Sequence, residues 1–290
     1  MKMDYSGALG KALGFCIHPQ RWVPYLLADL VFVSAALALL LPNIDSFIYL
    51  VSLSGAEMNP MLVAPLFTAF FGVLLLFLAW GLVTLWINGA VIHQSHKEHE
   101  FNKSWSVSGK RYLSILGVTV ITAAVGMIVG MVPYIGFVFS IIAGLIFFFT
   151  MQSVMVKGNG FAAALEDSYE IFKKHPFKVF LIWLLVAIMS VLILFVFSLP
   201  MLALAFKTIL SVTASGLQDT AALIGLISAV QGNLVQFFVS GIILLVGFAI
   251  TRAFAAKAQT EFYLQLRQPK TEEPEPKPKP VPARRKAKKG

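Results

Sequence analysis

The sequence predicts an all-α polytopic membrane protein, a bundle of six transmembrane helices arranged as three hairpins. Of the 290 residues, 58% are hydrophobic and 13% are charged, and the mean hydropathy is +0.81. Soluble domains carry about 25% charged residues, so most of this chain has no water-facing surface to cover. The apolar residues gather in six runs, and each is long enough to cross about 30 Å of hydrocarbon. In lipid, the backbone amides of such runs must bond within the run, so we expect helices.

One membrane domain at residues 1–266 accounts for all six runs, and residues 267–290 form a tail. Proline stands near the outer end of the first span of each pair, at Pro42, Pro133 and Pro200, where a helix can end or kink. The single cysteine excludes an intramolecular disulfide. The predicted spans are residues 22–41, 61–89, 112–132, 134–156, 178–202 and 234–256.

Lysine and arginine residues give the expected orientation. With odd-numbered spans running outward, all 23 of these residues except Lys207 fall on the side that holds both termini. The positive-inside rule makes that side cytoplasmic. We therefore expect a multi-pass protein of the plasma membrane with a cytoplasmic N-terminus and C-terminus.

Amphipathic segments precede the first and fifth spans, at residues 5–17 and 161–172, and each is followed by His-Pro, which breaks a helix. The middle hairpin has no His-Pro, so we interpret the three hairpins as a repeat that has degenerated in the middle. Such amphipathic helices are expected to lie flat at the cytoplasmic interface. They would either anchor the bundle or form a collar that senses lipid or docks partners.

The longest outer connection is predicted at residues 203–233. Within it, residues 220–230 are apolar but too short to cross a membrane. This segment would form either an outer interfacial helix or a cover on the bundle.

Asp29 is the most informative polar residue, because it lies about 10 Å inside the membrane on the cytoplasmic side. A carboxylate at mid-membrane costs about 2.5–3.5 kcal/mol on insertion scales, so a partner is expected. Asn88, Gln152 and Arg252 lie at similar depth, and Tyr25 is one helical turn away. The hypothesis is an intramembrane polar cluster with Asp29 paired to Arg252. The cluster would line a cavity for a polar ligand or ion, or else fix helix packing, with Asp29 ionised or protonated.

Three histidines, His93, His96 and His99, are weak candidates for a metal site. If the second span continued as a helix, they would lie along one drifting face and could bind zinc. Lys97 and Glu98 mark the stretch as solvated, and no cysteine supports a site, so no metal is expected.

The tail combines alternating proline with a basic end, which predicts a disordered linker. The basic end should be attracted to anionic lipids, with nucleic acid or a ribosome as the alternative partner. It contains no aromatic side chain that could stack on bases. Its basic residues are Arg284, Arg285, Lys286, Lys288 and Lys289.

Residues 164–176 read Ala-Leu-Glu-Asp-Ser-Tyr-Glu-Ile-Phe-Lys-Lys-His-Pro and precede an apolar span. With the hairpin layout around it, this segment resembles prokaryotic six-helix proteins similar to the membrane domain of glycerophosphoryl diester phosphodiesterases. The resemblance covers about residues 1–266 and implies a membrane domain without catalytic residues, since the catalytic barrel is absent.

No hydrolase, nucleotide-binding or redox motif is present, so we expect no enzyme and no cofactor. Three functions remain open. The first is a non-enzymatic protein that organises lipids or partner proteins at the cytoplasmic face. The second is a small transporter or channel that uses the Asp29 cluster. The third is a membrane-tethered docking factor for a ribosome or nucleic acid.

Overall fold

The computed structural model describes residues 3–44, 46, 60–214 and 219–267, and every regular element within them is helical. Six segments are long and apolar enough to cross a membrane, so the predicted all-α polytopic class is confirmed. They are Val23–Asn43, Ala64–His96, Tyr112–Gly130, Gly136–Lys157, Pro176–Thr213 and Leu234–Arg267.

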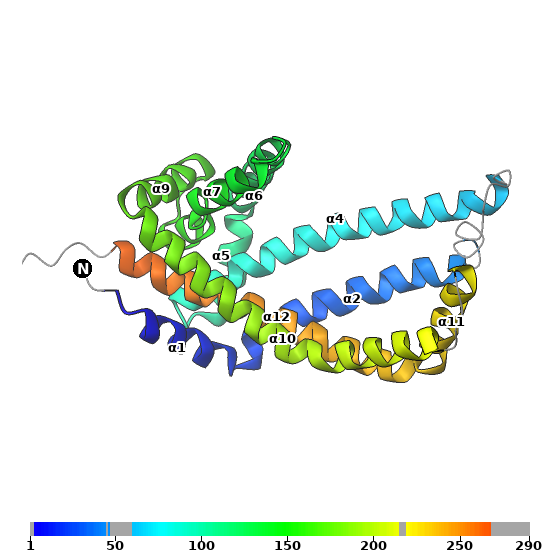
Figure 1. The fold of residues 1–290 in the computed structure, drawn as a ribbon. Helices are drawn as coiled ribbons and strands as arrows, with labels where there is room; N and C mark the ends of the chain where they lie inside the picture. The colour runs from blue at the N-terminus through cyan, green and yellow to red at the C-terminus, as the bar shows by residue number, and fades with distance from the viewer. Residues whose placement is uncertain (1–2, 45, 47–59, 215–218, 268–290) are drawn as a thin grey trace, which may run out of the picture.

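The spans pair as three hairpins, as predicted. The first pairs α2 (Val23–Leu40) with α4 (Pro60–His96), and the second pairs α6 (Tyr112–Gly130) with α7 (Gly136–Ile146). The third pairs α10 (Pro176–Ala214) with α12 (Leu234–Arg267). Figure 1 shows α2, α4, α10 and α12 extending away from one crowded end of the molecule. Their apolar side chains are mostly exposed, as expected of helices surrounded by lipid.

Three short helices occupy the crowded end, one before each hairpin. They are α1 (Tyr5–Cys16), α5 (Phe101–Lys110) and α9 (Phe161–Lys174), which we call the collar helices, and their end of the molecule the collar. Each contacts the second span of the preceding hairpin. Thus α5 contacts α4, and α9 contacts α7 and the segments that continue it. The ring closes because α1, the first helix, contacts α12, the last.

The collar helices repeat the same buried pattern. Each begins with an aromatic residue and buries a small residue at its fourth and eighth positions, so that two helix backbones can approach closely. These small residues are all at most 1% exposed: Ala8 and Ala12 in α1, Ser104 and Ser108 in α5, and Ala164 and Ser168 in α9.

Two of these serines, at equivalent positions of α5 and α9, also donate a hydrogen bond to a backbone carbonyl of the preceding span. The Ser108 hydroxyl donates to the carbonyl oxygen of Trp86 at 2.7 Å, and the Ser168 hydroxyl donates to that of Ile146 at 2.6 Å. Both bonds join residues 22 positions apart. The threefold repeat is therefore visible in the geometry, where the sequence indicated it only weakly.

The interpretation of the middle hairpin was incomplete, because α5 introduces it just as α1 and α9 introduce the others. The His-Pro breaks are confirmed, since α1 ends at Cys16 before a 3-10 turn (η1, Pro19–Arg21) and α10 begins at Pro176. The collar helices pack on the bundle, because each buries its small side chains on protein.

The fourth span is not the continuous helix that was predicted for residues 134–156. It breaks after α7 and resumes as α8 (Thr150–Gln152), followed by a π-helical turn, η3 (Ser153–Lys157). The break leaves backbone groups without helical partners, and α9 supplies one. The Ser168 hydroxyl accepts from the Phe149 N–H at 3.2 Å while donating to the Ile146 carbonyl.

The π-helical turn is closed by a glycine and an arginine. Gly158 has φ +82°, in the left-handed region that glycine adopts at least cost. A side chain there would also meet the Arg111 guanidinium, whose Nη1 donates to the carbonyl oxygens of Val154 at 3.0 Å and Met155 at 2.7 Å. Arg111 therefore satisfies carbonyls that the end of the span leaves open.

The fifth span is longer than predicted, because α10 continues through Pro200 to Ala214. A proline is tolerated inside a membrane helix when neighbouring groups accommodate the missing hydrogen bond. The outer segment contains a helix, α11 (Asp219–Gly232), which contacts α10 and α12 at the end opposite the collar. Short 3-10 turn η2 (Leu41–Asn43) ends the first span at Pro42, as expected.

The packing of α5 on α4 gives a direct test of the collar. An added Cβ at Gly89 would lie 2.4 Å from the Ser108 hydroxyl and 2.6 Å from Ile115 Cδ1. We expect Gly89→Ala to destabilise the protein by about 1–3 kcal/mol, as overpacking does. Gly81→Ala on the same helix is the matched control, because nothing lies within 4 Å of its added Cβ. Thermal unfolding in detergent compares the two, and equal melting temperatures would contradict the packing described here.

Candidate functional site

Asp29 and Arg252 form an ion pair inside the membrane segments, as predicted. Nη1 of Arg252 on α12 lies 2.9 Å and 3.0 Å from the two carboxylate oxygens of Asp29 on α2. The Asp29 side chain is 4% exposed and that of Arg252 is 29% exposed. The pair joins the first hairpin to the third.

Trp80 completes this pair and was not predicted. Its indole N–H donates to Asp29 Oδ1 at 2.9 Å, and the Arg252 guanidinium lies over the Trp80 ring at 5.3 Å and the Tyr25 ring at 5.8 Å. A carboxylate in low dielectric needs its remaining lone pairs satisfied, and the indole does this. The sequence could not single out Trp80, because tryptophan in an apolar run is equally expected to face lipid.

The other two predicted members of the cluster lie in different contacts. Asn88 is next to it, since its Oδ1 accepts from the Tyr25 hydroxyl at 3.0 Å. Gln152 is not in contact with Asp29. Its amide instead donates to Gln259 Oε1 at 2.8 Å, joining α8 to α12. The polar cluster is therefore Asp29, Arg252, Trp80, Tyr25 and Asn88, with Gln152 in a separate pair.

The collar contains a second ionic cluster, centred on Lys257 of α12. Its side chain is 5% exposed, and Nζ lies 2.7 Å from the Ser95 carbonyl oxygen, 2.7 Å from Glu98 and 2.8 Å from Glu261. The hydrogen bond from Lys257 holds the pKa of the Glu98 carboxyl below its ordinary value. This cluster ties the end of α4 to α12 beneath α1.

Arg21, which follows the first His-Pro, extends that cluster. It donates to Gln94 Oε1 at 3.2 Å and to the Glu98 carbonyl oxygen at 3.0 Å, and its guanidinium lies 4.9 Å from the centre of the Phe15 ring. Burial lowers the pKa of Arg21, and the charge of Glu98 opposes that shift. Arginine at this position thus joins α1, α4 and the loop after α4.

Asp167 of α9 is the centre of a third cluster. It forms an ion pair with Lys157 at 2.8 Å and another with Arg267, and it accepts from the Tyr263 hydroxyl at 2.7 Å. Lys157 ends the fourth span, and the other two partners lie on α12. The three clusters all connect α12 to other hairpins, so α12 is the common partner of the collar.

The histidines do not form the metal site that was considered. The helix ends at His96, so His99 does not continue its face, and His93 is buried with Nδ1 2.9 Å from the Ser104 hydroxyl. Within the described part of the chain, no three His, Cys, Asp or Glu side chains are placed to hold a metal ion. The single thiol, Cys16, lies 3.7 Å from the Ile250 carbonyl oxygen, and burial raises its pKa to about 12.

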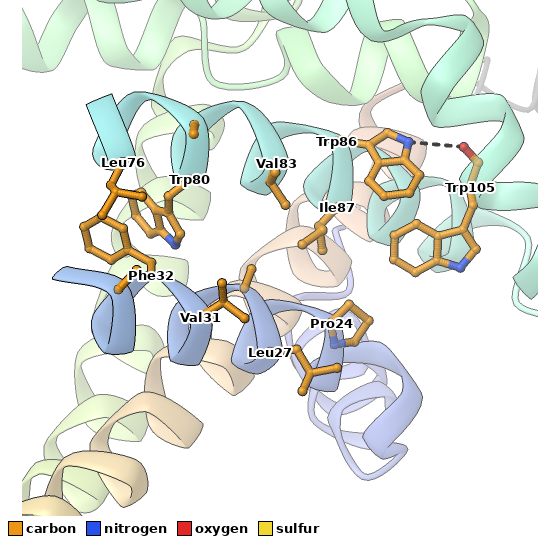
Figure 2. A pocket seen from close by; sticks show the side chains of 13 residues that line it. Pro24, Leu27, Val31, Phe32, Leu76, Trp80, Val83, Trp86, Ile87 and Trp105 are labelled. Atoms are coloured by element: carbon orange, nitrogen blue, oxygen red, sulfur yellow. Dashed lines mark hydrogen bonds between the residues drawn. The ribbon is translucent and has the colours of Figure 1, made fainter. Parts of the chain in front are cut away.

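An apolar groove of about 470 Å³ lies between α2 and α4, beside the ion pair (Figure 2). Leu27, Val31 and Phe32 contribute from α2, and Leu76, Trp80 and Val83 from α4. Asp29 and Arg252 do not line it. The groove shares Trp80 with the cluster, and no charged side chain lines it.

No protein-family model, curated protein or solved structure matches this chain. The resemblance to the membrane domain of glycerophosphoryl diester phosphodiesterases therefore stays a prediction. The tail cations Arg284, Arg285, Lys286, Lys288 and Lys289 lie outside the described residues.

The ion pair predicts that removing one charge destabilises the protein and that removing both restores most of the stability. Asp29→Asn should destabilise the protein by about 3 kcal/mol, because it leaves the Arg252 charge without its partner. Asp29→Leu combined with Arg252→Leu should recover most of that loss, since replacing both charges removes the unpaired ion. Thermal unfolding of the single and double variants in detergent measures this. Additive losses in the double variant would contradict a coupled pair.

The Glu98–Lys257 bond predicts a pH dependence. Because the folded state lowers the Glu98 pKa from 4.5, its contribution to stability is complete above that pH and is lost as pH falls through the folded pKa. We expect wild type to melt above Glu98→Gln at pH 7, with the difference shrinking below pH 4.5. Melting curves of both proteins between pH 7 and pH 3 test this. A constant difference across that range would show that Glu98 acts through something other than its charge.

Proposed function

We propose that this multi-pass membrane protein is non-enzymatic and organises lipid at the leaflet that borders the collar. The main support is a rim of exposed apolar side chains where chain segments enter the membrane. Ile17 after α1 is 78% exposed, Leu113 at the start of α6 is 79% exposed, and Phe177 at the start of α10 is 70% exposed. Side chains of this kind at an interface enter the boundary between head groups and acyl chains.

Lysines on the same collar helices supply the complementary charge. Lys11, Lys110 and Lys173 are exposed, one on each collar helix, and Lys11 also lies 3.3 Å from Glu261. Each lysine close to an anionic membrane surface contributes about 1 kcal/mol of attraction. Apolar and basic side chains at one end of the molecule are the combination that favours anionic lipid over zwitterionic lipid. The basic tail would add to this attraction, and the positive-inside rule would place the collar on the cytoplasmic side.

The ion pair favours this proposal over transport through Asp29. A carboxylate that passes an ion across the membrane needs access to water or to that ion. Here Arg252 binds both carboxylate oxygens of Asp29, and Trp80 binds one of them. We propose that the pair fixes the first hairpin against the third and carries no solute. Flux of protons or metal cations into proteoliposomes, abolished by Asp29→Asn in a folded variant, would reverse this choice.

The lipid preference is testable with the whole protein. The protein is extracted into nanodiscs from membranes that contain phosphatidylglycerol and phosphatidylcholine, and the co-purified lipids are quantified. We expect enrichment of phosphatidylglycerol around wild type. The triple change Lys11→Gln, Lys110→Gln and Lys173→Gln should reduce this enrichment about tenfold or more, given about 1 kcal/mol per lysine.

Lys207→Gln is the control, because Lys207 is an exposed lysine far along α10 from the collar. It should leave the enrichment close to the wild-type value. Equal enrichment in the wild type and the triple variant would overturn the proposal.

A further inference from the structure

The groove between α2 and α4 is formed by large side chains that hold the helices apart and small ones that leave space. Phe32 and Trp80 meet with ring centres 5.3 Å apart toward the deeper end. Trp86 and Trp105 meet at 5.1 Å at the collar end. The walls also carry three alanines, Ala28 between the two aromatic pairs and Ala35 and Ala79 at the deeper end. Figure 2 shows the two tryptophan-containing ends with the gap between them.

Two of the three indoles that line the groove have no N–H left for a polar ligand. The indole N–H of Trp80 is already bonded to Asp29 at 2.9 Å, and that of Trp86 is bonded to the Trp105 carbonyl oxygen at 3.3 Å. Both indoles therefore present ring faces to the space. The other lining side chains, apart from Trp105, are aliphatic, phenylalanine or proline. Only an apolar occupant gains from such walls.

The depth of the groove fits one leaflet. Its lining on α2 runs from Pro24 at the collar end to Ala35. At 1.5 Å per residue this is about 16 Å, half of the ~30 Å hydrocarbon core. The groove is also continuous with the lipid-facing surface of the spans, because Leu27, Val31 and Val83 on its rim are 57%, 70% and 46% exposed.

We propose that an acyl chain of a phospholipid from the collar-side leaflet occupies this groove. The inference rests on the proposed lipid-organising function and names a site for it. The chain lies against the Trp80 ring, and the indole N–H of that residue binds Asp29. The occupant therefore keeps water away from the ion pair that joins the first and third hairpins. A phospholipid would place its head group beside Trp105 and the start of α2, at the level of the collar.

The test uses full-length protein in nanodiscs of phosphatidylcholine that carries a photoactivatable diazirine on one acyl chain. After irradiation and digestion, mass spectrometry locates the labelled residues. We expect labelling of the groove residues Leu27, Val31, Leu76 and Val83 to exceed that of Met127 and Ile128 on α6 severalfold. Those α6 residues are 64% and 69% exposed, so they report ordinary contact with surrounding lipid.

Ala79→Phe fills the groove from an exposed position and should reduce groove labelling at least threefold. Ala123→Phe, at an exposed position of α6, is the matched control and should not change it. Melting curves establish that both variants are folded. Labelling in proportion to exposure alone, or groove labelling unchanged by Ala79→Phe, would overturn the proposal. So would photocrosslinking of the groove to a second protein chain in place of lipid.

The outcomes of the two lipid experiments are independent of each other. Phosphatidylcholine has no net charge, so groove labelling does not depend on the collar lysines. If groove labelling is absent while the triple lysine variant still loses phosphatidylglycerol, only the groove assignment is wrong. If labelling is present and the lysine variant behaves as wild type, the acyl-chain site stands and the collar proposal fails.

Discussion

Each collar helix buries small side chains against the second span of the preceding hairpin, and this contact determines how the three hairpins are held together. The spans expose most of their surface, so lipid surrounds much of them and inter-hairpin packing in the membrane is limited. Association of helices in lipid depends on close packing and polar contacts, since apolar burial gives no advantage there. The collar supplies both, through the small residues at repeated positions and through ionic clusters centred on Lys257 and Asp167. Helix α12 takes part in every cluster, so it acts as the common axis of the molecule.

The ion pair between Asp29 and Arg252 extends this organisation into the membrane. In a low-dielectric environment an isolated charge is costly. An ion pair there therefore favours one arrangement of the helices, because a wrong arrangement would leave both charged groups without a partner. Trp80 adds a donor to the carboxylate on one side and an apolar ring face on the other. The same residue thus separates a polar contact from the acyl-chain groove. Removing the indole would affect both, whereas filling the groove at Ala79 leaves the hydrogen bond in place.

The sequence predicted features that depend on long runs or on a single costly group. Six spans followed from apolar length, and the pairing of Asp29 with Arg252 followed from depth and charge. Helix α5 was missed because its fully buried residues are serines and its sequence, Phe-Asn-Lys-Ser-Trp-Ser-Val-Ser-Gly-Lys, holds only three large apolar side chains. Gln152 was assigned to the wrong partner because depth along a span does not specify which way a side chain points. The role of Lys257 depends on α12 continuing beyond the predicted span, which hydropathy does not report.

The distance in sequence between Asp29 and Arg252 has a consequence for biosynthesis. The two residues are 223 positions apart, so at ~5–20 residues per second a ribosome needs roughly ten to fifty seconds to make the second after the first. During that interval the first hairpin is completed, and Trp80, 51 positions after Asp29, is the earliest bonding partner of the carboxylate. The nascent hairpin therefore carries an acid that lacks its arginine partner until the last helix is inserted. A chain truncated before α12 would retain that defect permanently, which gives membrane quality control a chemical feature that distinguishes unfinished protein from finished protein.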